Sequence, residues 1–381
     1  MLSGIRVVDL GSFITAPLAA MMLGDLGADV IKVERPEGDP FRNSHGGKYG
    51  PTFLAFNRNK RGIVLDTGKP ADLEQLGRLV ATADVLVDNF RPGVLAKIGL
   101  EPKVLAERHP RLVHCSITGF GASGPYRARP AFDHVGQALS GITSLLVDPA
   151  RPEAFGPTMA DNVTAMYAAY GVLGALVERG RTGRGRRIEV NMLEASMAFI
   201  QDIYMGLTRT GQTSGKYTRI TRSQAFVLTC SDGKMLAIHL STTEKFWGEL
   251  VAALGAQDLA ADPRFATHQA RVKHYHDLAD ALQARFAVRE RGAWMAALDK
   301  TDVPFAPVNS VADALADPQV AALGTLARMA HPSEGEVVGI ACPLLSDGAR
   351  PLHDMRPPPL IGEHTAEILA ELENGAIQAK G

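Results

Sequence analysis

Residues 5–34, IRVVDLGSFITAPLAAMMLGDLGADVIKVE, decide the fold class because a strand pattern, a helix pattern and a second strand pattern follow one another. Residues 5–10 form a short apolar run that is typical of a buried strand. Residues 16–27 are typical of a helix, because a proline stands in the first turn and a glycine at the end. Residues 30–34 again indicate a strand. Together these lengths predict a parallel βαβ unit.

The same alternation continues beyond this unit. A long, Ala-rich helix is expected from about residue 161 to residue 178, and helical patterns separate the further strands. The further strand patterns are IVLD (63–66), VLV (85–87), LVHCSI (112–117) and IEVNM (188–192). We therefore predict an α/β protein whose large domain is Rossmann-like and contains a parallel sheet.

The chain changes character after residue 200. Residues 211–222 are rich in Gly, Ser and Thr, carry three cations and mark a boundary loop. A strand–turn–strand pattern follows, with Ser231-Asp232-Gly233 at the turn, and helical patterns come after it. We expect a large domain over residues 1–200, a small α+β domain over residues 225–325 and a C-terminal segment over residues 326–381.

Composition limits the classes of partner. The chain has 381 residues, 46% of them hydrophobic and 21% charged, as in an ordinary globular protein. Forty Lys and Arg against 41 Asp and Glu leave a net charge of −1, so nucleic acid is not an expected partner. Three widely spaced cysteines without a CxxC pair suit a reducing cytoplasm. The N-terminus does not have a signal-peptide pattern, and the longest uncharged helical stretch, 162–177, is short of the roughly 20 residues of a membrane span. We expect a cytoplasmic protein without a membrane partner.

Several familiar sites are excluded by their motifs. The loop after the first strand, residues 11–17, has one glycine followed by Phe and Ile, whereas a dinucleotide cradle needs G-x-G-x-x-G. The P-loop, the paired histidines of HExxH and the G-x-S-x-G elbow are also absent from the sequence. We therefore expect no bound nicotinamide, flavin or metal. An enzyme without such a group and a binding protein both remain open at this point.

Five segments in order resemble the family III CoA-transferases, the group that contains formyl-CoA and carnitine CoA-transferases and α-methylacyl-CoA racemase. The segments are RVVDLGSFITAPLAAMMLGDLGADVIKVERPEGD (6–39), NRNKRGIVLD (57–66), ADVLVDNFRPGVLAKIGL (83–100), RTGRGRRIEVNMLEASM (181–197) and LIGEHTAEIL (360–369). The resemblance implies a CoA thioester as substrate and no permanently bound cofactor. It also implies an interlocked homodimer, in which the C-terminal segment returns to the large domain.

By this resemblance the nucleophile is Asp161, at the start of the long helix. From the residues alone, an aspartate before an apolar helix is a favoured N-cap. The two roles are compatible, because the free amides and positive dipole end of a helix favour a charged carboxylate. Asp161 would attack the acyl-CoA and carry the acyl group as a covalent intermediate.

The resemblance also implies contacts with CoA. Their expected positions are at or beyond the carboxyl ends of the predicted strands, where ligands of open α/β sheets bind. The residues are Arg35, Leu65, Asp66, Asn89, Phe90, Lys97 and Met192. The plain alternatives are surface charges for Arg35 and Lys97, a turn for Asn89-Phe90 and the core for Met192.

One position bears on the type of reaction. Racemases of the family carry a histidine where this chain has Phe132, and a phenyl ring accepts no proton. His134 is two residues further on, about 200° around a helix. We therefore expect a CoA-transferase, with a 2-methylacyl-CoA racemase as the alternative and a non-catalytic acyl-CoA binder as a third hypothesis.

The acyl site departs from the relatives in two places. Ile14 stands where some transferases have Gln, and the glycine run of formyl-CoA transferases is missing. His45 and the cations Lys216, Arg219 and Arg222 could meet a dicarboxylate larger than oxalate. The expected substrates are an acyl-CoA, such as succinyl-CoA or a related dicarboxylyl-CoA, and a small free carboxylic acid.

Overall fold

The computed structural model describes residues 1–44, 49–154, 156–241, 244–351 and 355–374. Contacts divide the chain into two compact units. The first unit comprises the described residues of Met1–Thr143, Ala154–Tyr204 and Leu323–Gly381, and the second those of Ser144–Glu153 and Met205–Ala322.

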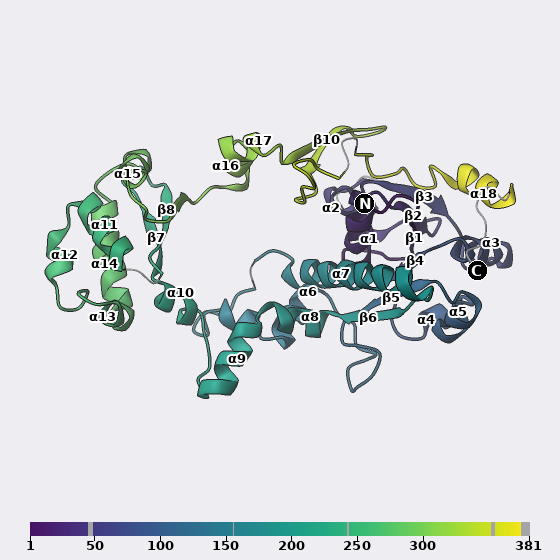
Figure 1. The fold of residues 1–381 in the computed structure, drawn as a ribbon, viewed down its shortest axis with the longest axis horizontal. Coiled ribbons are helices and arrows are strands. Elements are labelled where there is room, and N and C mark those ends of the chain that lie inside the picture. The colour runs from purple at the N-terminus through teal and green to yellow at the C-terminus, as the bar shows by residue number, and fades with distance from the viewer. Residues whose placement is uncertain (45–48, 155, 242–243, 352–354, 375–381) are drawn as a thin grey trace. The chain divides into compact units, whose positions relative to one another are not determined.

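A six-stranded sheet forms the centre of the first unit (Figure 1). Its strands are β1 (Arg6–Asp9), β2 (Asp29–Glu34), β3 (Lys60–Val64), β4 (Val85–Asp88), β5 (Val113–Thr118) and β6 (Arg187–Asn191). The order is β3-β2-β1-β4-β5-β6 and every neighbouring pair is parallel, which confirms the predicted α/β fold with a parallel sheet. The strand order reverses between β1 and β4, so the loops that leave these two strands diverge and open a crevice.

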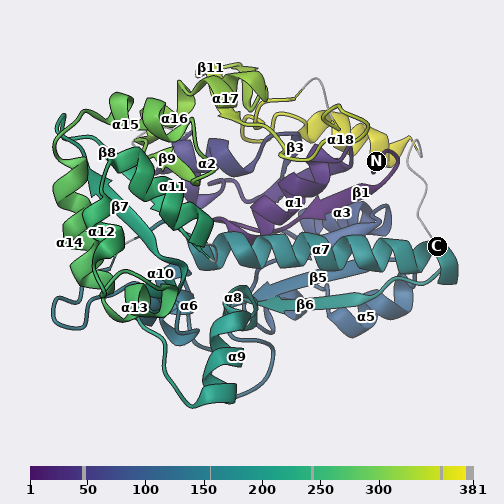
Figure 2. The ribbon, with the colours of Figure 1, turned by 60° about the vertical axis from the view of Figure 1, so that its left-hand side comes forward.

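Helices cover both faces of this sheet. α1 (Thr15–Asp25) and α7 (Met159–Thr182) lie on one face, as Figure 2 shows, and their alanines allow close packing on the strands. α3 (Pro70–Ala81), α5 (Pro102–Arg108) and α18 (Thr365–Glu373) share the core of the other face. Successive strand residues alternate between the two cores, as Val7 and Val8 do in β1.

The C-terminal helix is tied to the edge of the sheet by ion pairs. Arg61 of β3 donates to Glu367 and Glu371 of α18, each at 2.6 Å. The shorter elements of the first unit are η1 (Pro40–Asn43), α2 (Pro51–Phe56), α4 (Val94–Lys97), α6 (Asp133–Leu139), α8 (Met192–Phe199), β10 (Leu326–His331) and β11 (Gly335–Ile340). β10 and β11 form an antiparallel hairpin that the sequence patterns did not indicate.

The second unit contains a three-stranded antiparallel sheet of β7 (Ala225–Thr229), β8 (Met235–His239) and β9 (Phe305–Pro307). β7 and β8 confirm the predicted strand–turn–strand. Its helices are α10 (Thr218–Ser223), α11 (Glu244–Leu254), α12 (Gln257–Ala261), α13 (His268–Lys273), α14 (Tyr275–Phe286), α15 (Arg291–Leu298), α16 (Val311–Leu315) and α17 (Pro318–Ala322). α10 corrects the second half of the predicted loop over residues 211–222, because residues 218–223 form a short helix that ends before the buried Gln224.

Two elements lie where the units meet along the chain. They are η2 (Thr143–Leu145) and α9 (Gln201–Thr210). In the part of the chain that the structure describes, no helix has both the length and the apolar character required to cross a bilayer.

Candidate active site

One asparagine joins the two loops that diverge at the point where the strand order reverses. Ser12 follows β1, and its amide donates to Asn89 Oδ1 at 3.0 Å. Asn89 follows β4, and its Nδ2 donates to the Ser12 carbonyl at 2.7 Å and to Thr15 Oγ1 at 3.1 Å. The Asn89 side chain therefore holds the β1 loop in place, a role that sequence reasoning missed.

Two cavities open beside these loops. The first has a volume of about 320 Å³ and the second about 230 Å³. Ser12 and Phe90 line both, so the cavities meet over the Ser12–Asn89 clamp. Of the predicted site residues, the first cavity is lined by Arg35, Leu65 and Phe90, and the second by Ile14, Asn89, Phe90, Phe132, Asp161 and Met192.

Two of the predicted site residues that the structure describes, Asp66 and Lys97, line neither cavity. The side chain of Asp66 instead accepts from the Gly68 amide at 2.9 Å, which closes the turn before α3. Lys97 is exposed at the end of α4. Their contacts with CoA stay predictions. His45 lies outside the described residues.

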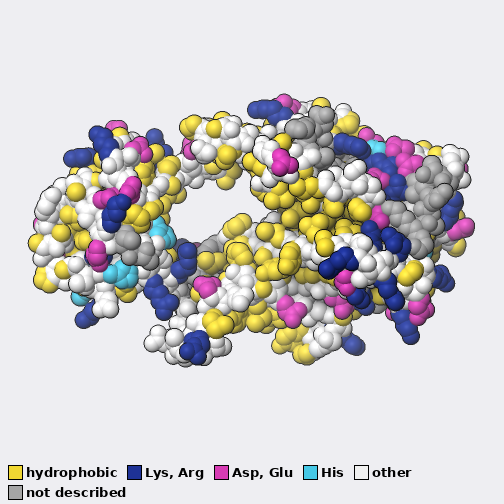
Figure 3. Space-filling view, in the orientation of Figure 1, with side chains coloured by type: hydrophobic (Ala, Val, Ile, Leu, Met, Phe, Trp, Pro, Cys, Tyr) yellow, Lys and Arg dark blue, Asp and Glu magenta, His cyan; other side chains and the backbone are white. Residues whose placement is uncertain are grey.

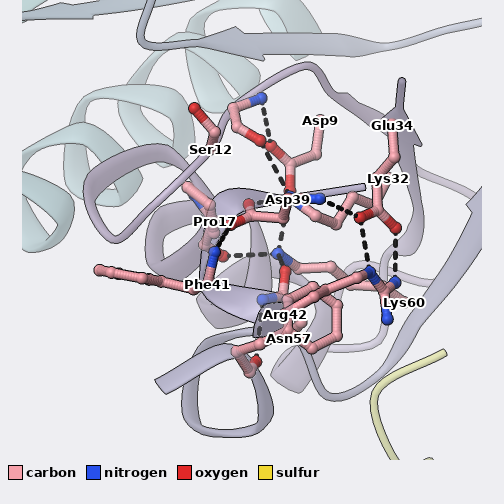
Figure 4. Close-up of polar contacts among 12 residues, drawn as sticks. Asp9, Ser12, Pro17, Lys32, Glu34, Asp39, Phe41, Arg42, Asn57 and Lys60 are labelled. Atoms are coloured by element: carbon pink, nitrogen blue, oxygen red, sulfur yellow. Dashed lines mark hydrogen bonds and ion pairs between the residues drawn. The ribbon is translucent and has the colours of Figure 1, made fainter. Parts of the chain in front are cut away.

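Buried charges support the floor of the first cavity (Figure 4). Lys32 Nζ donates to the Gly11 carbonyl at 2.9 Å and to Asp39 Oδ2 at 3.1 Å. Asp9 accepts from the Gly11 amide at 2.8 Å and from Lys60 Nζ at 2.9 Å. Burial lowers the pKa of Lys60 to about 8. The network fixes the backbone of the β1 loop from below, because both polar groups of Gly11 are bound to it.

A second buried ion pair extends this network. Arg42 Nε and Nη2 donate to the two carboxylate oxygens of Glu34 at 2.7 and 2.5 Å. Its guanidinium lies over the Phe53 ring, 3.8 Å from the centroid. Glu34 and Asp39 line the first cavity, and the pairing with Arg42 and Lys32 offsets their negative charges there. The visible signal in the sequence was a set of charged residues within apolar strands, such as Asp9 and Lys32.

Asp161 is the third residue of α7 and not its N-cap. The helix begins at Met159, with Thr158 as the N-cap, so the N-cap interpretation of Asp161 is wrong. The amide of Asp161 donates to Asp133 Oδ1 at 3.1 Å. Asp133 is buried in the first turn of α6, and its other oxygen accepts from Gln137 Nε2. A second carboxylate thus lies beside Asp161.

The electrostatic environment of Asp161 differs from the expected one. Burial, and to a smaller extent the negative charge of Asp133, together raise the pKa of Asp161 to about 7. We expected the helix N-terminus to hold this carboxylate charged. Desolvation and the like charge of Asp133 instead make the ionised form costly.

Aromatic rings form one wall of the second cavity. The Phe13 ring lies edge-to-face with Phe41 at 5.2 Å and with Phe132 at 5.8 Å between centroids. Phe13 has a φ of +64°, a conformation that costs a non-glycine residue about 1 kcal/mol or more. Phe132 is 62% exposed. The wall is apolar and offers no proton acceptor.

The remaining wall carries cations that sequence reasoning missed. Arg91, Arg127 and Arg129 line the second cavity together with Asp161. The available signal was the RAR run at 127–129, shortly before Phe132. Among the described residues, no group of three or more His, Cys, Asp or Glu side chains is placed to hold a metal ion.

The comparisons with known proteins agree on one family. A family model described as CoA-transferase family III matches residues 2–365. Succinate–glutarate CoA-transferase of Agrobacterium fabrum is 34% identical over 98% of this chain and 96% of its own length. Succinyl-CoA–D-citramalate CoA-transferase of Chloroflexus aurantiacus is 32% identical over 97% of this chain and 94% of its own length.

A solved structure gives the same result. The crystal structure of a CAIB/BAIF family protein from Brucella suis is 35% identical and has a TM-score of 0.86, with 97% of this chain and 98% of that chain covered. Sequence and fold therefore agree over nearly the whole length. The chain belongs to CoA-transferase family III and is a CoA-transferase.

Proposed function

We propose that this enzyme moves CoA from a dicarboxylyl-CoA, such as succinyl-CoA, to a free carboxylic acid through a covalent intermediate on Asp161. The observation that carries the proposal is that Asp161 lines the same cavity as the loops that follow β1 and β4. The printed names of the relatives, which mention succinate, glutarate and citramalate, support the dicarboxylate class.

The two cavities suit the two ends of an acyl-CoA. We place the nucleotide in the first cavity, where Arg35 is exposed and has no ion-pair partner among the described residues. The pantetheine arm would cross the shared residues Ser12 and Phe90, and the thioester would reach Asp161 beside Met192. CoA is a substrate in this scheme and leaves after each cycle.

Each step exchanges one acyl bond for another. The Asp161 carboxylate attacks the thioester carbonyl, the C–S bond breaks, and an acyl-aspartyl anhydride and CoA thiolate form. The thiolate attacks the aspartyl carbonyl, which releases the donor acid and leaves aspartyl-CoA. The acceptor carboxylate attacks this thioester, its C–S bond breaks, and a new anhydride and CoA thiolate form. The thiolate then attacks the acceptor acyl carbon, which yields the new acyl-CoA and frees Asp161.

The alternative, a 2-methylacyl-CoA racemase, needs a proton acceptor opposite Asp161. Phe132 lies in the second cavity and accepts no proton. His134 is exposed and does not line that cavity; its Nδ1 lies 3.4 Å from Asp133 Oδ2. Transfer is therefore favoured. Deuterium incorporation at the α-carbon in the absence of an acceptor acid would instead support the racemase.

We also propose that a second copy of the chain covers the exposed face of α7 in an interlocked homodimer. Met166, Tyr170 and Val177 are 57%, 74% and 66% exposed, an unusual apolar stripe for a solvated helix. In Figure 3, hydrophobic side chains gather where Figure 1 places α1 and the start of α7. Light scattering should give twice the 40.7 kDa chain mass, and a Tyr170→Glu variant should shift toward the monomer.

The cytoplasmic location and the 225–325 domain stay proposals.

Covalent labelling tests the function. The enzyme is incubated with succinyl-CoA, quenched and measured by intact mass, and the adduct is mapped by peptide sequencing. We expect an adduct on Asp161, no adduct and no transfer in Asp161→Ala, and wild-type behaviour in Asp202→Asn, an exposed carboxylate of α9. Full transfer by Asp161→Ala would refute the mechanism.

A further inference from the structure

The second cavity carries more positive charge than the covalent mechanism uses. Arg91, Arg127 and Arg129 line it, and among the described residues none of the three has an ion-pair partner. Arg91 directly follows Phe90, which lines both cavities, so it stands at the junction toward the CoA arm. Arg127 and Arg129 line only the cavity of Asp161.

A closed loop presents these two arginines. A Cβ atom on Gly119 would lie 2.2 Å from the Cβ of Ala131, so the two ends of the loop touch and only glycine fits there. The Gly119 carbonyl also accepts from the Leu193 amide at 3.2 Å, next to Met192 of the cavity. Residues 120–130 therefore form a loop that begins and ends at the same point of the site, and Arg127 and Arg129 lie within this loop.

Arg129 is held in a defined orientation. Its guanidinium carbon lies 3.9 Å from the centroid of the Tyr126 ring, and Tyr126 packs edge-to-face on Phe120 at 5.9 Å. A stacked guanidinium uses its flat face, while its N–H donors point outward in its plane. The donors of Arg129 therefore remain available for a carboxylate, which binds two of them at once.

The location points to the acyl group rather than to CoA. Arg129 precedes Asp133 by four positions, so their Cα atoms are at most about 14 Å apart, and Asp133 accepts from the Asp161 amide. The phosphates of CoA belong to the nucleotide end, which the first cavity would hold, and neither Arg127 nor Arg129 lines that cavity. The anion that remains near the thioester is the far carboxylate of a dicarboxylic acyl chain.

We propose that Arg129, assisted by Arg127, binds the distal carboxylate of the acyl group and of the incoming acid, and thereby selects dicarboxylates over monocarboxylates of equal chain length. The aromatic wall of Phe13, Phe41 and Phe132 would cover the methylene groups between the two carboxyl ends. This inference rests on the proposed function, because it takes the acyl group to react at Asp161.

The test compares succinyl-CoA with butyryl-CoA, whose four-carbon chain ends in a methyl group. Arg129→Gln should lower kcat/KM for succinyl-CoA about 10- to 100-fold, the effect of losing a charged hydrogen bond. It should leave kcat/KM for butyryl-CoA and the Kd of free CoA unchanged. Arg129→Lys should restore part of the loss, and Arg127→Gln should show a smaller loss of the same selectivity. Arg108→Gln, an exposed arginine at the end of α5, is the matched control.

The results that would overturn this proposal differ from those that would contradict the proposed covalent function. An equal loss with both thioesters, together with weaker CoA binding, would overturn the proposal and assign the arginines to the phosphates of CoA. Unchanged selectivity in an Arg127→Gln/Arg129→Gln double variant would overturn it as well. Selective transfer by the wild type without any Asp161 adduct would contradict the proposed covalent function instead, so the two failures can be told apart.

Discussion

Replacing Asp133 with asparagine should make the enzyme active at lower pH. Asparagine has nearly the same size and keeps an oxygen that can accept the Asp161 amide, which donates to Asp133 at 3.1 Å. Gln137, which donates to the other oxygen, can turn its amide to match the new NH₂ group, with the loss of its longer hydrogen bond to the Pro157 carbonyl at 3.3 Å. The substitution therefore removes one negative charge beside Asp161 with little change in shape.

The size of the effect follows from the pKa of Asp161. Its rise from 3.8 to about 7 corresponds to about 4 kcal/mol at 1.36 kcal/mol per pH unit. Burial is the larger cause, so loss of the Asp133 charge should move the titration of Asp161 acidward by only about one pH unit. At pH 6 the ionised fraction should rise from about a tenth to about a half, a gain of about fivefold.

The assay is kcat/KM for CoA transfer from pH 5 to pH 9. The wild type should rise with pH and level off above about 7, because the nucleophile must be ionised, and Asp133→Asn should level off about one pH unit earlier. Asp202→Asn controls for the loss of an unrelated carboxylate. A midpoint that stays in place or moves to higher pH in Asp133→Asn would refute the assigned electrostatic role of Asp133.

Three further substitutions test the stability of the site. Because the pKa of Asp161 is raised in the folded state, the protein loses stability as pH rises from about 4 to 7. Asp161→Asn should therefore raise the free energy of unfolding at pH 8 by about 1–2 kcal/mol, after discounting for partial exposure. The gain should be much smaller at pH 4, and urea titrations at the two pH values would show the difference. Lys60→Met should lower the free energy of unfolding by about 3–5 kcal/mol, because Asp9 is left buried without its ion-pair partner. A loss under 1 kcal/mol would contradict the stabilising role of the Asp9–Lys60 pair. Asn89→Ala should reduce kcat/KM at least tenfold while unfolding shifts by about 1–2 kcal/mol, because the Ser12 loop is released; an unchanged rate would argue against the clamp.

The sheet could be predicted from sequence because each central strand is a short buried run of Val, Ile and Leu between recognisable helix signals. The reversal of strand order depends on the whole topology, and so does the crevice that opens between the loops after β1 and β4. Local patterns also missed the β10–β11 hairpin. Burial alternates regularly along β10, but its buried residues, Ala327, Met329 and His331, do not stand out from the exposed Ala330 as an apolar pattern in the sequence. Sequence patterns predict a helix or strand where the burial of one of its faces determines its position in the fold.

The sequence likewise predicted only part of the candidate site. The resemblance named Asp161, Phe132 and Met192, which line one cavity in the structure, whereas residue patterns alone favoured an N-cap for Asp161. Its raised pKa comes first from burial and second from the charge of Asp133, which is 28 residues away in sequence, so no local motif reveals it. Arg129 was missed for a similar reason, since an arginine in a loop is ordinarily solvated surface and only the cavity distinguishes it.

The cost of ionising Asp161 is useful under the proposed mechanism. An acylated aspartate is uncharged, as the protonated acid is, so burial and the charge of Asp133 disfavour the free carboxylate but not the covalent intermediate. The same free energy that raises the pKa therefore favours attack on the thioester. A fully solvated aspartate would be ionised at every physiological pH, yet it would lose more stabilising hydration when it became acylated. Under the proposed mechanism, the environment of Asp161 therefore lowers the ionised fraction near pH 7 and makes the carboxylate that does form a more reactive nucleophile, and the second carboxylate, Asp133, contributes to both effects.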